Sequence, residues 1–299
     1  MVLNRGFTYT EIIGGREEGR TLLAHLAARY GHTSAGEWLE RISAGRVLLD
    51  GLAGRPDAVL KRGQGVAWVR PPWEEPQVPL VYAVLQQDEA LLAVAKPSGL
   101  PTLPGGGFLE NTLLSLVRRR APEASPMHRL GRGTSGVVLF VRTSQAGKIV
   151  SRAWRERRVT KVYRALVEGT PVVETFIIDS PIGPRPHPLL GLVHAADPSG
   201  KPSRSDVRVL ERRGETSLVE VTIETGRPHQ IRIHMAACGH PLAGDPLYAA
   251  GGGFHGGTGA LPGDTGYLLH AMRLALPHPI TGEAFEVECR PPRVLRIGQ

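Results

Sequence analysis

Apolar residues near the start of the chain follow the spacing of two short helices. One apolar face comprises positions 22, 23, 26 and 27, and a second comprises positions 38, 39 and 42. Thr33 or Ser34 can cap the second helix, and Glu37 stands three residues after Ser34, as in a capping box. The pattern then changes to that of strands, and we expect RVLLDG and LKRGQGVAWV to form two arms of a hairpin.

A proline-rich stretch, RPPWEEPQVP, follows this compact module. Proline fixes the backbone and removes hydrogen-bond donors, so the stretch suits neither a helix nor a central strand. We therefore predict an N-terminal module over residues 1–72, a linker over residues 73–80 and a second domain over residues 81–299.

Strand patterns predominate in the second domain. Two apolar runs around Gln87-Asp88-Glu89 predict a hairpin, and GVVLFVRT, KVYRALVEG, SDVRVLERR and TSLVEVTIET are typical of sheet strands. NTLLSLVRRR predicts a helix capped by Asn111, SQAGKIVSRAWRERR an amphipathic helix, and RPHQIRIHMAACG a helix ending at Gly239. The glycine-rich stretch 251–266 predicts a flexible surface loop. Because the strands do not alternate regularly with helices, we expect an α+β fold with a mixed, mostly antiparallel sheet, preceded by a small α/β module.

Composition indicates a globular protein outside the membrane. Hydrophobic residues make up 41% of the 299 positions, yet no apolar run is long enough to cross a bilayer. The first residues lack the pattern of a secretory signal, so we expect a cytoplasmic location. Cys238 and Cys289 offer no metal-ligand spacing and no disulfide framework, and we expect both to be buried.

The formal charge of +8 favours a polyanionic partner. Seven basic residues and one acid lie between Lys148 and Arg164, which fits either an RNA contact or a solvated helix face. Only five of the 36 basic residues are lysine; the rest are arginine, which binds phosphate in a bidentate manner.

One glycine-rich stretch has the residue types of a catalytic or ligand-binding loop. In MHRLGRGTSGVVLFVR, the residues from Gly131 to Gly136 have the G-x-G-x-x-G spacing of a dinucleotide loop. Such a loop must follow a strand and open a helix, whereas a strand pattern follows this turn. Ser135 also lacks the G-x-S-x-G setting of a hydrolase nucleophile. We therefore expect neither activity.

The same stretch resembles the H-R-L-D-x-x-T-S-G signature of the RluA-like RNA pseudouridine synthases. Four further segments are similar to family motifs in the same order: AVAKPSGLPT, KVYRALVEG with DSPIG, TGRPHQIRIHMAACGHPLAGDPLYA and LLHAMRLALPHPITGEAFEVECRPP. The N-terminal module, with GRVLLDG, is similar to the S-four-like RNA-binding modules often joined to these enzymes. The resemblance covers nearly the whole chain.

This resemblance implies isomerisation of uridine to pseudouridine in ribosomal or transfer RNA, without metal or organic cofactor. Tyr163 matches the tyrosine that packs on the base, and Arg232 matches the arginine that pairs with the catalytic aspartate. Arg129 matches a residue that displaces the flipped base, while His128 and Thr134 shape the turn. We expect His128, Tyr163 and Arg232 to surround one cavity. The residues expected to contact substrate or RNA are His128, Arg129, Leu130, Thr134, Arg227, His229, Gln230, Arg46 and Lys161. We expect a monomer that binds RNA and no membrane.

The family's catalytic aspartate position is Gly131 in this chain, and glycine can be neither nucleophile nor base. Three explanations remain open: catalysis with a carboxylate from elsewhere, a catalytically silent RNA-binding protein, or a different reaction. We favour catalysis, because the other signature residues remain. The candidate carboxylates are Glu110, Asp179, Asp206 and Asp245. Asp179 and Asp245 match positions that are also acidic in ordinary relatives, which suggests structural roles for both.

Without its aspartate partner, a buried Arg232 would be an unpaired charge, which is costly. We therefore predict that Arg232 either contacts a carboxylate outside the family pattern or is substantially hydrated.

Overall fold

The computed structural model describes residues 3–31, 33–187, 189–256 and 259–298. The chain divides into two compact units, Met1–Glu75 and Pro76–Gln299. Each unit has its own hydrophobic core. The division falls within the stretch 73–80 for which the sequence predicts a linker. Among the described residues, the helices are too short or too polar to cross a bilayer.

The first unit consists of two helices and a four-stranded antiparallel sheet. Its elements are β1 (Phe7–Ile12), α1 (Leu22–Arg29), α2 (Ala35–Ser43), β2 (Val47–Leu49), β3 (Leu52–Ala53) and β4 (Gly65–Arg70), with strand order β1-β4-β2-β3. Both predicted helices are confirmed, and Ser34 forms the predicted capping box with Glu37. Strand β1 was not predicted; nearly all of its residues are exposed, and the aromatic-polar alternation of Phe7 to Thr10 is short.

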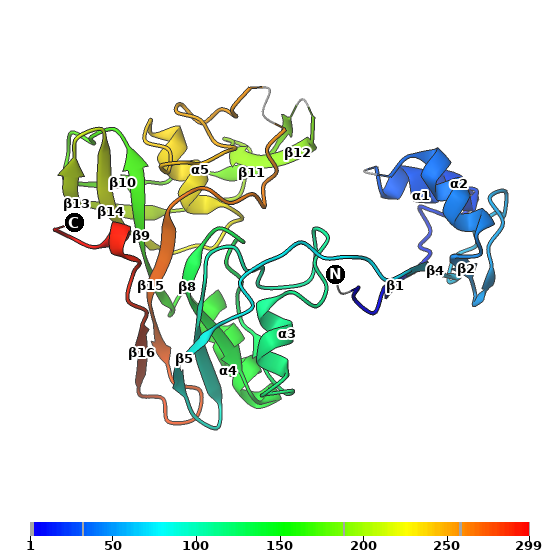
Figure 1. The fold of residues 1–299 in the computed structure, drawn as a ribbon, viewed down its shortest axis with the longest axis horizontal. Coiled ribbons are helices and arrows are strands. Elements are labelled where there is room, and N and C mark those ends of the chain that lie inside the picture. Colours follow the sequence, from blue (N-terminus) through cyan, green and yellow to red (C-terminus); the bar gives the residue numbers. More distant parts are fainter. Residues whose placement is uncertain (1–2, 32, 188, 257–258, 299) are drawn as a thin grey trace. The chain divides into compact units, whose positions relative to one another are not determined.

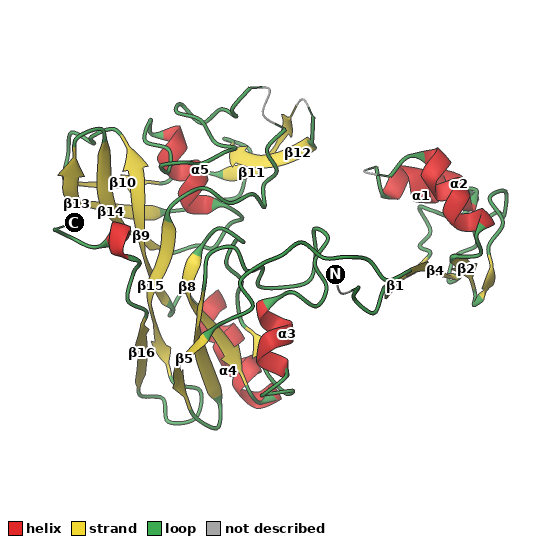
Figure 2. Ribbon diagram, in the orientation of Figure 1, coloured by secondary structure: helices red, strands yellow, loops and turns green. Residues whose placement is uncertain are grey.

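A ten-stranded sheet forms the centre of the second unit (Figures 1 and 2). Its main path runs β10-β13-β14-β9-β15-β8-β6-β5, with β16 beside β15 and β7 beside β8. Every pairing is antiparallel except that of β15 with β8. The strands are β5 (Ala83–Gln87), β6 (Leu91–Lys96), β7 (Ser125–Pro126), β8 (Ser135–Val141), β9 (Thr160–Glu168), β10 (Thr175–Ile178), β13 (Ser205–Arg213), β14 (Thr216–Ile223), β15 (Leu269–Pro277) and β16 (Ala284–Glu288). The predicted α+β class is confirmed.

Helices pack on both faces of this sheet. They are α3 (Leu113–Arg118), α4 (Ser144–Arg155) and α5 (Gln230–Ala237), with a short 3-10 helix, η1 (Arg293–Leu295). Alternate residues of β8 point to opposite faces: Val138 and Phe140 join a core with α3 and α5, whereas Val137 and Leu139 join one with α4. Figure 1 shows α5 beside a separate hairpin formed by β11 (Ile182–His187) and β12 (Gly191–Ala196).

Two local predictions were wrong. Helix α3 is capped by Thr112 instead of Asn111, because the Thr112 hydroxyl accepts a hydrogen bond from the Ser115 amide. Cys238 is exposed, since it follows the last residue of α5, where the chain leaves the core; Cys289 is buried as predicted. Residues 257 and 258 of the predicted surface loop lie outside the described residues.

Candidate active site around the turn at Gly131

The glycine-rich turn connects a bent segment to a buried strand. The Thr134 amide donates to the Gly131 carbonyl at 3.1 Å, and β8 begins at the next residue, Ser135. A helix would have to start here for phosphate to meet free amide groups. The turn at Gly131 therefore lacks the strand-to-helix setting of a dinucleotide loop.

A second loop, the KPSGLPT segment at residues 96–102, fixes this turn from one side. The Ser98 hydroxyl donates to the Gly133 carbonyl at 2.7 Å, and the Gly99 amide donates to the Arg132 carbonyl at 2.8 Å. The Thr102 hydroxyl exchanges hydrogen bonds with both the carbonyl and the amide of Leu130. The two segments therefore form one rigid unit.

Lys96 lies at the centre of this contact and is 2% exposed. Its ammonium group donates to the carbonyls of Pro97, Leu100 and Arg132 at 2.9, 2.6 and 3.2 Å. Burial disfavours the charged form and lowers the pKa of Lys96 to about 7.

This shift predicts a measurable pH dependence of stability. Between about pH 7 and the pKa of an unfolded lysine near 10.5, the unfolded chain holds a proton that the native chain has lost. The free energy of unfolding of the wild type should therefore rise with pH across this window, by up to about 1.4 kcal/mol per pH unit from this group. Lys96→Met removes the titrating group, so urea denaturation at several pH values should show its deficit growing from pH 7 to pH 10. The exposed Lys148→Met serves as control; a constant deficit for Lys96→Met would contradict the prediction.

Three neighbouring strands align the turn with Tyr163. Tyr163 in β9 lies opposite Ala271 in β15, and Ala271 lies opposite Gly136 in β8. Tyr163 is 8% exposed and shares a core with Leu130 and Tyr267. Burial raises the pKa of its phenol to about 12, so the hydroxyl stays protonated at neutral pH.

Arg232 on α5 is sealed and paired. Its guanidinium donates to both carboxylate oxygens of Asp245, at 2.7 and 2.8 Å, and to the Pro262 carbonyl at 2.9 Å. The prediction of hydration or of a carboxylate outside the family pattern was wrong, because the acid matching the family pattern already pairs with the arginine. The Asp245 carboxylate also accepts the amides of Leu247 and Tyr248, so its hydrogen-bonding capacity is used internally.

Tyr267 is a residue of this site that the sequence analysis missed. Tyr267 lies two residues before the start of β15 at Leu269 and is only 4% exposed. The Arg232 guanidinium lies 4.2 Å from the centre of its ring, and its hydroxyl is 3.3 Å from the Thr134 hydroxyl. Tyr267 is 136 positions away from Gly131 in sequence, so no local pattern indicated this contact.

His229 is the N-cap residue of α5, three residues before Arg232. Its backbone is left-handed, with φ of 55°, and its Nδ1 is 2.9 Å from the Tyr248 hydroxyl. Burial, followed by the nearby charge of Arg232, lowers the pKa of His229 to about 3. The charge of Arg129 contributes to the same shift, which places this exposed arginine close to His229.

His128 has a different environment from the one expected. Its Nε2 accepts a hydrogen bond from the Leu139 amide at 3.0 Å, and its ring stacks on Trp154 of α4. Burial, together with the charge of Lys161, lowers the pKa of His128 to about 4. The ring therefore secures β8 and α4, whereas Tyr163 and Tyr267 lie in the core on the α5 side of the sheet.

The other residues expected to contact RNA fall into three groups. Lys161 and Gln230 are buried and hydrogen-bond inward, Lys161 to the carbonyls at the end of β14 and Gln230 to the turn before α5. Arg227 is half-buried and donates to the Pro202 carbonyl. Arg46 is exposed and belongs to the first unit. Their contact with RNA stays a prediction.

The other candidate carboxylates have separate surroundings. Asp179 is exposed, after the end of β10, and Asp206 in β13 pairs with Arg204 at 2.9 Å. Glu110 lies in the loop before α3 and has an interaction partner. Of the four, Asp245 alone is seen to contact Arg232 in the described structure, and each of its carboxylate oxygens accepts a hydrogen bond from that arginine.

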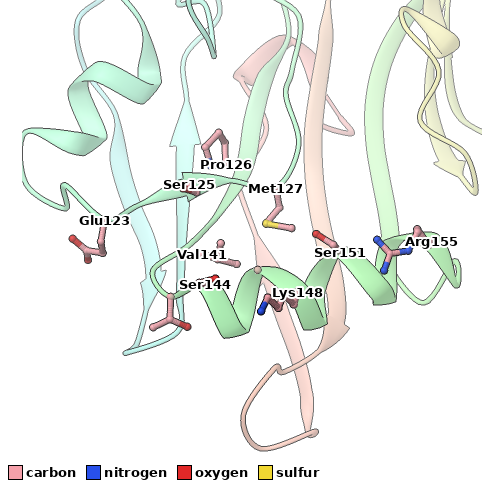
Figure 3. Close-up of a pocket in the computed structure, with 11 residues that line it drawn as sticks. Glu123, Ser125, Pro126, Met127, Val141, Ser144, Lys148, Ser151 and Arg155 are labelled. Atoms are coloured by element: carbon pink, nitrogen blue, oxygen red, sulfur yellow. The ribbon is translucent and has the colours of Figure 1, made fainter.

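An open groove of about 770 Å³ lies between α4 and the segment around β7 (Figure 3). Figure 3 shows Ser144, Lys148, Ser151 and Arg155 on the helix side and Met127 opposite. Lys148 and Arg155 are exposed, so part of the predicted basic cluster faces this groove. Arg152 and Arg158 of the cluster instead pair with Glu156.

Comparison with known proteins identifies the family. A family model described as RNA pseudouridylate synthase matches residues 90–237. The chain is 42% identical to an uncharacterized RNA pseudouridine synthase of Synechocystis, over 89% of this chain and 92% of that protein. It is 36% identical to RNA pseudouridine synthase 5 of Arabidopsis thaliana, over 92% of this chain and 90% of that protein. It is also 32% identical to ribosomal large subunit pseudouridine synthase D of Neisseria meningitidis serogroup B, over 93% and 76% of the two chains.

A solved structure agrees with these matches. The human RNA pseudouridylate synthase domain containing 1 superposes with a TM-score of 0.57 at 28% identity, covering 75% of this chain and 89% of that chain. The matched region includes the turn at Gly131, Tyr163 and Arg232, which the fold brings to one side of the sheet. Sequence and structure together show that the chain belongs to the RNA pseudouridine synthase family.

Proposed function

We propose that this protein isomerises uridine to pseudouridine in ribosomal or transfer RNA, as a cytoplasmic monomer. The observation on which this rests is the assembly of Tyr163, Arg232 and the turn at Gly131 on one side of the large sheet. In the reaction, the N1–C1′ bond of uridine breaks, the base rotates, and C5 bonds to C1′. The nucleotide must leave the base stack for protein groups to reach both the sugar and the base.

The residues of this side of the sheet suit such a nucleotide. The buried phenol of Tyr163 offers an aromatic face and a protonated hydroxyl. Arg129 is exposed, and its charge acts on His229. It can bind a phosphate or fill the space that the flipped uridine leaves in the RNA. On the opposite face of the sheet, Lys148 and Arg155 on the groove beside α4 can bind the RNA backbone.

The first unit offers exposed basic side chains to RNA. Exposed basic side chains surround its small core; they include Arg16, Arg20, Arg29, Arg46, Lys61 and Arg62. Exposed arginine and lysine side chains of this kind can contact phosphate without reading sequence. Within the proposal, it holds the structured RNA while the second unit receives the uridine.

Pseudouridine mapping tests this function. Ribosomal and transfer RNA from cells with and without the gene are compared by chemical mapping, and a plasmid copy of the gene is returned as control. We expect at least one pseudouridine to be lost on deletion and restored by the wild-type copy. If every pseudouridine persists without the gene, the proposed activity is wrong, and an RNA-binding role without catalysis becomes the explanation.

A further inference from the structure

The space beside Gly131 is already filled. A Cβ atom added to Gly131 would lie 2.8 Å from the Tyr267 hydroxyl oxygen, closer than real Cβ contacts. A Cβ on Gly133 would lie 2.9 Å from Cζ of the same ring. Neither glycine has the positive φ that would itself require glycine. The tyrosine therefore explains why both positions lack a side chain.

The ring is held in this place by its neighbours. Tyr267 is 4% exposed, packs over the Arg232 guanidinium at 4.2 Å, and has its hydroxyl 3.3 Å from that of Thr134. Because Asp245 already pairs with Arg232, the tyrosine is not needed to neutralise that charge. Its hydroxyl is nearer to the position of a Gly131 Cβ, at 2.8 Å, than the Thr134 hydroxyl at 3.6 Å.

We propose that Tyr267 replaces the missing side chain at position 131, filling its volume and supplying a catalytic hydroxyl to the uridine. This inference rests on the proposed function. A carboxylate can only accept hydrogen bonds, whereas a phenol can also donate one. When the N1–C1′ bond breaks, its electron pair leaves with the uracil, and the hydroxyl donates a hydrogen bond to the negative charge on that base. After rotation, C5 bonds to C1′, C5 loses its proton to water and N1 gains one from water, so no oxidant or reductant is needed.

Thermal unfolding tests the shared volume without any RNA. Gly131→Asp in the full chain should melt lower by about 3–10 °C, because its side chain would overlap the Tyr267 ring. The double variant Gly131→Asp with Tyr267→Leu should melt above the single variant, since leucine vacates the overlap. Gly226→Asp is the matched control, because a Cβ there meets no atom within 4 Å. If Gly131→Asp melts like the wild type, or if the double variant shows no recovery, the replacement is refuted.

Turnover measurements test whether the Tyr267 hydroxyl takes part in catalysis. Ribosomal and transfer RNA from cells lacking the gene serve as substrate, and pseudouridine formation is followed by chemical mapping. Tyr267→Phe keeps the ring, so it should melt as the wild type does but lose about 10²- to 10³-fold in kcat, with a smaller change in KM. Tyr82→Phe, directly before the edge strand β5, removes a tyrosine hydroxyl elsewhere in the unit and should keep full activity.

The outcomes separate this inference from the proposed function. A wild-type protein that forms pseudouridine together with a fully active Tyr267→Phe refutes the catalytic hydroxyl alone. An inactive wild type refutes the proposed function and with it the hydroxyl's role, whereas the melting series still decides whether Tyr267 and residue 131 share one volume.

Discussion

Gly136→Ala is expected to lower the free energy of unfolding by about 3–5 kcal/mol. Gly136 has a φ of +114°, which side chains with a Cβ rarely adopt. An added Cβ would also lie 2.1 Å from the carbonyl oxygen of Ala271 and 2.6 Å from its nitrogen. These are backbone atoms of the neighbouring strand, so the overlap can be relieved only by separating β8 from β15.

The consequence reaches the candidate site, because the parallel pairing of β8 with β15 is short. It consists of Ser135 opposite His270 and Gly136 opposite Ala271. Urea denaturation measures the loss, and Gly147→Ala in α4 is the control. A Cβ on Gly147 would meet Val141 at an ordinary 3.5 Å, and alanine favours a helix, so that variant should be as stable as the wild type or more so. Equal stability of both variants would show that the strands separate at little cost.

Local sequence patterns predicted the elements whose own residues determine them. The capping box of Ser34 with Glu37 and the hairpin at Asp88 depend on contacts within a few residues. Strand β1 depends instead on pairing with β4, from Ile12 opposite Gly65 to Phe7 opposite Arg70, and nearly all of its residues are exposed. Strands β11 and β12 form a local hairpin, but their proline and glycine residues do not give the pattern of a strand.

The residues of the candidate site also divide into those that motifs along the chain predict and those that only the fold brings together. The turn at Gly131, Tyr163 and Arg232 could be found from motifs along the chain. The partner of Arg232 was expected to lie outside the family pattern, yet it is Asp245 within that pattern. Tyr267 could not be found, because only the pairing of β15 with β8 brings it to the turn. A contact between distant segments leaves no periodic signal in a single sequence.

Arg232→Met should lower the free energy of unfolding by about 3–5 kcal/mol, because it leaves the Asp245 carboxylate buried in the core without its positively charged partner. The two side chains are only 2% and 1% exposed, and they share two hydrogen bonds. Arg152→Met is the control: Arg152 pairs with Glu156 at a similar distance but is 72% exposed, so solvent screens the pair and its loss should change stability little. Urea denaturation compares the two variants, and equal losses would contradict the prediction.

Asp245→Asn decides whether this pair is structural or catalytic. If the carboxylate only neutralises Arg232, the amide variant should lose stability and activity together, because a buried guanidinium is left without its counter-charge. A variant that unfolds like the wild type but no longer forms pseudouridine would instead identify Asp245 as the carboxylate that replaces the one missing at position 131. Asp245 is buried and accepts hydrogen bonds from Arg232, Leu247 and Tyr248, all groups of its own surroundings, and we therefore expect the structural outcome.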